Sequence, residues 1–332
     1  MAVFSLVFLK VLSSLLSVLI GYLSGKFSNI EKDSIASLLF YFVAPIVFFA
    51  IPTSTELTFS SLGISALTFV LCTMLSLFSY WLYGKVWQDS HRNILALSAG
   101  TGNSGYVVLP IAAALFDDHT LSIYALGLIG ISICEASVGC YFCARSVGTF
   151  KQSVLRVAKL PLLNAFFLGC AMSFLGFHLP DFFDDFISNM KGAFSILGMV
   201  TIGLALSSIK EFDFDIKFTA AAFASKFLFY PALFNIFILL DRFYFKWLDV
   251  NYYNALQLLC VAPMATNTIV LASLYKIYPE KVATAVLLSL LFVLLYMPIM
   301  ATIFLEGILH YIIDLNLNHG KVWNNLLLKL KF

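Results

Sequence analysis

Charged residues are scarce in this sequence of 332 residues. Asp, Glu, Lys and Arg make up 11% of the chain, against about 25% in an average soluble protein, and 61% of the residues are hydrophobic. A soluble domain of this size has too much surface to cover with so few charges. The composition excludes a cytosolic enzyme, a nucleic-acid binder and a disordered chain. It indicates an all-α membrane protein that crosses the bilayer several times.

Other residue types are absent where particular chemistries need them. The six cysteines lie inside apolar runs, so no secreted disulfide framework is predicted. The N-terminus lacks the basic start and the small-residue cleavage site of a signal peptide. The zinc-protease pattern H-E-x-x-H does not occur, and no cofactor or metal is predicted.

Ten apolar segments are long enough to cross a bilayer core as helices, which takes about 20 residues. They cover residues 3–25, 35–51, 62–83, 94–116, 121–144, 160–177, 192–209, 218–240, 254–275 and 282–305. Three pairs of segments start at a near-constant offset of about 160 residues, as in an internal repeat. These pairs are the first and sixth, the third and eighth, and the fourth and ninth. Five helices in each half force the second half to enter the membrane inverted. We therefore predict ten transmembrane helices in two inverted five-helix repeats.

The predicted organisation follows from these segments. Residues 1–146 form the first repeat, 147–159 a cytoplasmic linker, 160–306 the second repeat, and 307–332 a tail that is either an interfacial helix or a frayed end. Lysine and arginine concentrate in the loops after the odd-numbered segments. This bias places those loops in the cytoplasm and both termini on the outer side of a plasma membrane or bacterial inner membrane.

Two corresponding segments, the fourth and the ninth, are interrupted in the middle. The fourth reads A-G-T-G-N-S-G-Y-V-V-L-P from Ala99, and the ninth reads V-A-P-M-A-T-N-T from Val261. Glycine and proline weaken the helical backbone, and unpaired backbone groups are tolerated at this depth only inside protein or beside a watery cavity. Paired breaks of this kind indicate a transporter site, where asparagine amides and helix N-termini suit a carboxylate. The alternative is a pair of proline-kinked helices with asparagines that link neighbouring helices.

The predicted substrate-binding residues are Asn103, Ser104, Gly105, Pro110, Pro263, Thr266, Asn267 and Thr268. Glu135 and Lys226 are ionisable residues inside predicted spans, at a similar depth from the cytoplasmic ends. They are either a coupling pair, in which Glu135 takes a proton or Lys226 neutralises an anion, or a structural feature such as a permanent ion pair or a lysine that reaches toward the interface.

Ser104 raises a second class of function, intramembrane proteolysis. The segment Gly102-Asn103-Ser104-Gly105 matches the G-x-S-G pattern of rhomboid-type serine proteases. A serine nucleophile needs a base within hydrogen-bonding reach. All five histidines fall in loops, at span ends or in the tail, so the sequence does not predict an enzyme.

Several segments together resemble the auxin efflux carrier family of bacterial and plant transporters, within the bile-acid/auxin carrier superfamily. The resemblance covers nearly all ten spans. The motifs that carry it are Gly102-Asn103 to Pro110 in the fourth span, Leu160-Pro161 to Pro180 around the sixth, Lys226 with Pro231 in the eighth, and Pro263 to Tyr275 with Val282 to Ser289 in the last two. The family often has a proline near Val200-Thr201 in the seventh span, and this chain has none there.

The resemblance implies a scaffold of the first, second, sixth and seventh spans, often dimeric, and a mobile core of the other six. The broken fourth and ninth spans cross near their prolines and hold a small organic anion, such as a malate-like dicarboxylate or an auxin-like monocarboxylate. It implies Asn103, Pro110, Pro263 and Asn267 as site residues. A sodium-coupled bile-acid-type symporter has the same topology. Coupling to a proton or to sodium stays open, although a sodium cage needs clustered oxygen ligands.

Overall fold

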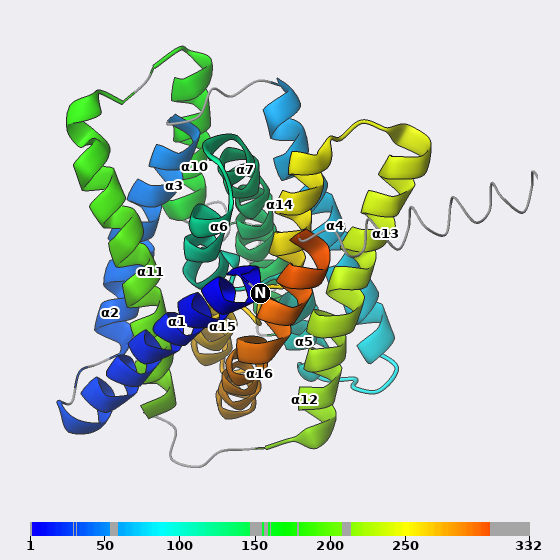
Figure 1. Ribbon diagram of the computed structural model, residues 1–332. Coiled ribbons are helices and arrows are strands. Elements are labelled where there is room, and N and C mark those ends of the chain that lie inside the picture. Colours follow the sequence, from blue (N-terminus) through cyan, green and yellow to red (C-terminus); the bar gives the residue numbers. More distant parts are fainter. Residues whose placement is uncertain are drawn as a thin grey trace, which may run out of the picture.

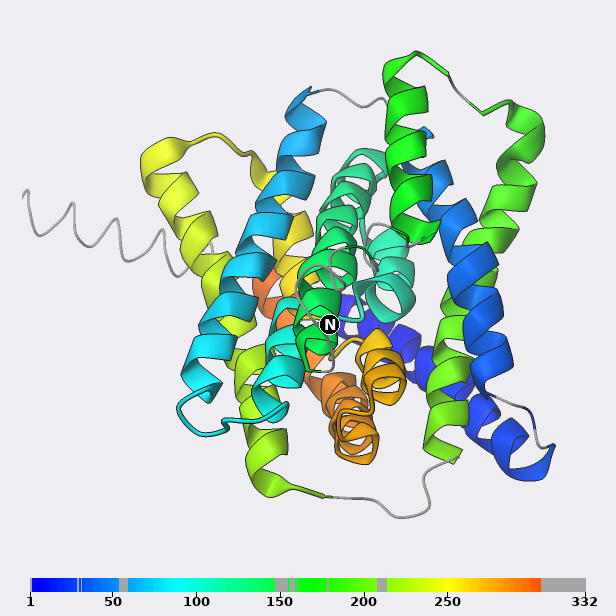
Figure 2. The same cartoon turned by 180° about the vertical axis from the view of Figure 1, so that it is seen from behind.

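The computed structural model describes residues 2–28, 30, 32–53, 59–146, 155, 159, 161–177, 179–207 and 214–305, and this part of the chain forms helices and no strand (Figures 1 and 2). The α-helices are α1 Ala2–Phe27, α2 Lys32–Leu38, α3 Ala44–Thr53, α4 Phe59–Tyr83, α5 His91–Gly100, α6 Leu109–Leu115, α7 Asp118–Cys134, α8 Cys140–Arg145, α10 Pro161–Phe174, α11 Asp184–Ser207, α12 Ile216–Phe223, α13 Tyr230–Leu240, α14 Val250–Cys260, α15 Asn267–Tyr275 and α16 Pro279–Leu305. The π-helical turns are η1 Leu39–Val43, η2 Ser104–Val108, η3 Glu135–Gly139, η5 Ala224–Phe229 and η6 Asp241–Phe245, and η4 Asp181–Phe183 is a 3₁₀ turn.

Seven helical stretches in the described part of the chain are long and apolar enough to cross a membrane. They are Val3–Phe27, Leu62–Tyr83, His91–Leu115, Asp118–Arg145, Asp184–Ser207, Ile216–Phe245 and Pro279–Leu305. Two shorter apolar helices, Tyr41–Thr53 and Asn164–Phe174, lie in the second and sixth predicted segments, and the ninth is divided between α14 and α15. The all-helical membrane class is confirmed. The ten-span inverted repeat and its unit boundaries stay predictions. The tail 307–332 and most of the linker 147–159 lie outside the described residues.

One helix begins well before its predicted segment. Hydropathy starts the seventh segment at residue 192, whereas α11 begins at Asp184. Asp184 and Asp185 occupy the first turn of this helix. Carboxylates stabilise the positive end of the helix dipole there, and a search for apolar residues does not register that contribution.

The helices separate into two groups in both views of the molecule. Helices α1, α2, α3, α10 and α11 pack together on the left in Figure 1, and α4, α12, α13 and α14 lie on the right, while α16 lies in the centre and packs against α1. Helices α1 and α11 pack most closely, because Gly21 and Gly203 have no side chains at their contact. Helix α7 passes through the middle of the molecule and packs against α4 and α14.

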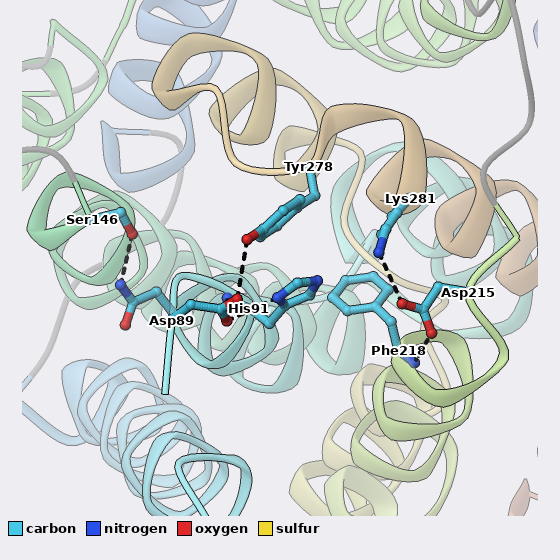
Figure 3. Close-up of polar contacts among 8 residues, drawn as sticks. Asp89, His91, Ser146, Asp215, Phe218, Tyr278 and Lys281 are labelled. Atoms are coloured by element: carbon cyan, nitrogen blue, oxygen red, sulfur yellow. Dashed lines mark hydrogen bonds and ion pairs between the residues drawn. The ribbon is translucent and has the colours of Figure 1, made fainter. Parts of the chain in front are cut away.

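A polar cluster joins the ends of several helices at the lower end of the molecule in Figure 1 (Figure 3). The His91 ring at the start of α5 stacks on Tyr278, with 3.8 Å between ring centroids. Asp89 contacts both rings, with Oδ1 2.8 Å from His91 Nδ1 and Oδ2 accepting from the Tyr278 hydroxyl at 3.2 Å. The cluster therefore ties the start of α5 to the connection between α15 and α16.

Asp215 forms the second part of this cluster, at the start of α12 (Figure 3). Its carboxylate caps the helix by accepting from the Phe218 amide at 3.0 Å, and it accepts from Lys281 Nζ of α16 at 2.9 Å. The Phe218 amide, followed by the Lys281 ammonium, holds the pKa of Asp215 below its usual range. The folded state therefore favours the ionised carboxylate.

Replacing Asp215 by alanine is expected to lower the free energy of unfolding by about 1 kcal/mol at neutral pH, because the helix loses its N-cap. Since the pKa is depressed in the folded state, this stabilisation is complete above the pKa of the unfolded chain and is lost as the pH falls through the folded value. Thermal unfolding in detergent at neutral and at acidic pH measures both effects. Asn189→Ala, at an exposed position of α11 beyond its first turn, is the control. Equal melting of Asp215→Ala and wild type at neutral pH would contradict the prediction.

Candidate functional site

The two interrupted helices contact each other at their breaks. Helix α5 ends at Gly100 and helical structure resumes at Ser104, while α14 ends at Cys260 and α15 begins at Asn267. The Asn103 amide nitrogen donates to the Pro263 carbonyl at 2.9 Å. The Asn103 side chain donates through Nδ2 to Thr266 Oγ1 at 2.7 Å. One asparagine thus joins the first break to the second through both its backbone and its side chain.

Side chains from three other helices bind backbone groups at the two breaks. Lys226 Nζ of η5 donates to the Thr101 carbonyl at 2.7 Å, the Tyr124 hydroxyl of α7 donates to the Ser104 carbonyl at 2.8 Å, and Ser289 Oγ of α16 accepts from the Met264 amide at 3.3 Å. An unpaired backbone group in an apolar interior costs several kcal/mol. These contacts therefore stabilise the irregular backbone in the centre of the molecule.

A cavity of about 60 Å³ lies beside the two breaks. One water molecule needs about 10–15 Å³ by this measure, so the cavity holds several waters or a small polar group. Its polar lining comes from Asn103, Ser132, Glu135, Thr266 and Asn267. The cavity thus brings together residues of the fourth, fifth and ninth predicted segments.

Another wall of the cavity is apolar and comes from the group of helices that contains α3 and α11. Ala44 and Phe48 of α3 and Phe194 of α11 form it. The Tyr106 ring of η2 packs against Phe194, with 4.6 Å between ring centroids, and lies flat on Gly198, where an added Cβ would be 2.5 Å from the ring. The cavity therefore lies between α3 and α11 on one side and the two breaks with α7 and η3 on the other.

Glu135 and Lys226 have different surroundings. Glu135 is half-buried, lines the cavity and lies beside the Asn267 side chain. Lys226 is fully buried, and besides its bond to Thr101 its ammonium lies 3.5 Å from the centroid of the Tyr230 ring. In the described part of the chain the two residues form no direct ion pair, and Lys226 does not reach toward a surface. The carboxylate faces the cavity, whereas the ammonium is packed behind the first break.

The remaining predicted site residues lie around the cavity at different distances. Gly105 lines it. Ser104 and Thr268 are fully buried, and neither is among the described lining residues. Pro263 contributes its carbonyl to the second break, whereas Pro110 lies farther along, at the start of α6. The structure therefore brings Asn103, Gly105, Thr266 and Asn267 together at the cavity, and the other four are not among its described lining residues.

Ser104 lacks the partner that a serine nucleophile requires. Its Oγ is buried and has no hydrogen-bond partner among the described residues. His91 instead contacts Asp89 and Tyr278. The geometry of the described chain gives no support to the protease alternative.

Several residues of the site were not predicted from the sequence. Phe48 and Phe194 line the cavity from the second and seventh segments, and Tyr124 and Ser289 support the breaks. Of these residues, only Tyr124 and Ser289 could have been suspected from the sequence, because a polar group in an apolar helix needs a hydrogen-bond partner. The chain has 34 phenylalanines, and the sequence does not distinguish those that face a cavity.

Comparison with known proteins gives two findings. Residues 144–301 match the model of a family described as membrane transport protein. The chain is also 26% identical over 312 residues to the uncharacterized transporter MJ1031 of Methanocaldococcus jannaschii, and this similarity covers 89% of the chain and 98% of that relative. The family match includes the second break and Lys226, and the similarity to the relative extends over nearly its full length.

Proposed function

We propose that the chain belongs to the auxin efflux carrier family of membrane transport proteins, as its sequence predicts, and that it is a secondary transporter of small organic anions. The observation that carries the proposal is the cavity beside the two crossing breaks. Substrates of malate-like dicarboxylate or auxin-like monocarboxylate type fit this assignment. The protein acts as a permease, and no catalytic step is assigned to it.

Asn103 and Asn267 are proposed to bind the substrate carboxylate. Both line the cavity, and Asn103 Oδ1 is buried without a partner in the described chain. A half-turn of the Asn103 amide group lets Oδ1 accept from the Thr266 hydroxyl and points Nδ2 into the cavity. The carboxylate then receives one amide hydrogen from each break, which fixes its position between the two helices.

Transport is proposed to occur by alternating access. The apolar wall formed by α3 and α11 belongs to the scaffold predicted from the family, and the broken helices belong to the moving core. Motion of the core along this wall exposes the cavity first to one side of the membrane and then to the other. We further propose that the protein is a homodimer with both termini on the outer side of a plasma membrane or bacterial inner membrane.

The test is exchange of radiolabelled anions in proteoliposomes preloaded with the same unlabelled anion. The probes are malate, which is a dicarboxylate dianion, and pyruvate and indole-3-acetate, which are a small and a large monocarboxylate. Wild-type protein is expected to exchange at least one of them above protein-free vesicles. The double variant Asn103→Ala with Asn267→Ala is expected to lose at least about tenfold in exchange rate, because two hydrogen bonds of about 1 kcal/mol each are removed from the bound anion.

The matched control is Asn235→Ala. Asn235 lies in α13, is half-buried like Asn267, and donates to the Pro231 carbonyl instead of lining the cavity. It is expected to exchange at the wild-type rate. Full exchange in the double variant would remove the crossing breaks from the binding site. Exchange that requires sodium at every pH would favour a sodium-coupled symporter of the bile-acid type.

A further inference from the structure

We infer that transport by this protein is coupled to protons through Glu135, and that one proton enters the site with each substrate molecule. This inference rests on the proposed function and adds the coupling ion and the charge of the substrate to it. The observation that carries it is that Glu135 and the two asparagines line the same small cavity.

Glu135 and a bound carboxylate are neighbours at the same donor. The Glu135 carboxyl lies beside the side chain of Asn267, which begins α15 at the second break and lines the same cavity. An asparagine amide has two N–H groups, held in one plane and directed to adjacent positions. A substrate carboxylate at Asn267 therefore lies next to the Glu135 carboxylate. Two adjacent carboxylates in a poorly solvated site are not both ionised.

The single positive charge near the cavity in the described part of the chain, on Lys226, neutralises one carboxylate and not two. Of the described residues that line the cavity, Glu135 alone carries a formal charge. Lys226 acts electrostatically on Glu135 from η5, while its ammonium is held by the Thr101 carbonyl and the Tyr230 ring. With Glu135 ionised, this pair is neutral and an incoming anion is uncompensated. With Glu135 protonated, Lys226 balances the charge of the substrate.

The other groups around Glu135 do not replace it as the proton acceptor. Besides Lys226, those that act on it electrostatically are Tyr106 of η2, Cys134 of α7, and Cys140 and Cys143 of α8. Thiols and phenols are uncharged at neutral pH. Helix α4, which also packs against η3, contains no Asp, Glu, Lys or Arg, and α5 has its charged residues only at its first turn. Of the acidic groups around the cavity, Glu135 is therefore the one that we infer to change its charge.

The transport step balances in charge and in protons. A proton binds a Glu135 oxygen from the side on which the substrate enters, and no covalent bond to carbon is made or broken. Proton and anion leave together on the opposite side. A monocarboxylate then crosses with no net charge, whereas a dicarboxylate dianion carries one net negative charge with its proton.

The experiment measures exchange and accumulation in the same proteoliposomes, with labelled pyruvate and malate as probes. An inward proton gradient is expected to drive wild-type accumulation of pyruvate above equilibrium. With a potassium–valinomycin clamp, the membrane potential is expected to change malate accumulation and to leave pyruvate accumulation unchanged. The apparent Kd is expected to rise about tenfold per pH unit where Glu135 is ionised before binding, as one linked proton requires.

Glu135→Gln removes the titration while it keeps the size of the side chain. The exchange rate and apparent Kd of this variant are expected to lose their dependence on pH. Accumulation of the labelled anion is expected to be independent of the proton gradient. Glu280→Gln, which changes an exposed carboxylate at the start of α16, is the control and is expected to keep the wild-type pH profile.

A binding measurement separates this inference from the proposed function. Calorimetry in buffers of different ionisation enthalpy counts the protons taken up on binding, with about one expected for wild type and none for Glu135→Gln. Wild-type exchange without proton uptake, or a Glu135→Gln profile that still depends on pH, would overturn the inference and leave the transporter assignment in place. Failure of wild type to bind or exchange any probe would overturn both.

Discussion

Replacing Lys226 by methionine is expected to reduce anion exchange by at least about tenfold while membrane insertion is retained. Methionine has a similar length and is apolar, but it cannot donate to the Thr101 carbonyl, which the ammonium binds at 2.7 Å. Thr101 is fully buried, so its carbonyl loses its partner in an apolar interior. A buried acceptor without a partner costs about 1–3 kcal/mol, and 1.4 kcal/mol is a factor of ten. The first break then loses the geometry that positions Asn103.

Two comparisons separate this effect from a general loss of charge. Lys217→Met changes an exposed lysine in the same stretch and is expected to behave as wild type. Gly102→Ala keeps the lysine but places a methyl group 2.6 Å from its ammonium, so it is expected to displace Lys226 from Thr101 and to lower exchange. Gly63→Ala, in α4 and away from the cavity, has no atom within 4 Å of the added Cβ and is expected to exchange close to the wild-type rate. Wild-type exchange by Lys226→Met would contradict the role assigned to this ammonium.

Alanine at Gly203 is expected to destabilise the protein by about 3 kcal/mol, at the upper end of the cost of overpacking. An added Cβ there would overlap the Val18 carbonyl and the Tyr22 amide of α1, and a Cβ at Gly21 would overlap the Val200 carbonyl of α11. These neighbours are backbone atoms, which cannot move aside by a change of side-chain rotamer. Helix α1 must therefore separate from α11. Thermal unfolding in detergent measures the loss, and the double variant with Gly21→Ala is expected to unfold at a still lower Tm.

The control for this prediction lies on the same helix. Gly192 is also in α11, and an added Cβ there has no atom within 4 Å. Gly192→Ala is therefore expected to match or slightly exceed the stability of wild type, because alanine is the better helix former by about 1 kcal/mol. If Gly203→Ala unfolds at the same Tm as Gly192→Ala, the stability of the protein does not depend on the close approach of α1 and α11.

Much of the fold could be predicted from the sequence because long apolar segments have few alternatives to helices in a membrane. The two breaks could also be predicted, since glycine, proline and asparagine occur together at the middle of apolar segments 94–116 and 254–275. The Asn103 contacts with Pro263 and Thr266 bring these two segments together, as the carboxylate-site hypothesis requires.

The partners of the charged residues could not be predicted in the same way. Glu135 and Lys226 both lie in π-helical turns, η3 and η5, which change the direction of the following side chains relative to a regular α-helix. Depth counted at a fixed rise per residue suggested that the two side chains meet. The structure instead directs Lys226 to Thr101 and Glu135 to Asn267. Tertiary packing decided between orientations that the sequence left open.

The apolar wall of the cavity has a consequence for the speed of the proposed cycle. Ala44, Phe48 and Phe194 offer no side-chain hydrogen-bonding groups, and one polar contact across this junction is the bond from Ser195 Oγ to the Tyr106 carbonyl at 2.9 Å. Such a bond contributes only about 1 kcal/mol net. In the proposed cycle, sliding along this wall separates the Tyr106 ring from the surface of Gly198 and shifts α16 against α1, to which it also packs. The rate of the cycle then depends on the packing at the wall, and substrate affinity depends on the breaks on the other side of the cavity.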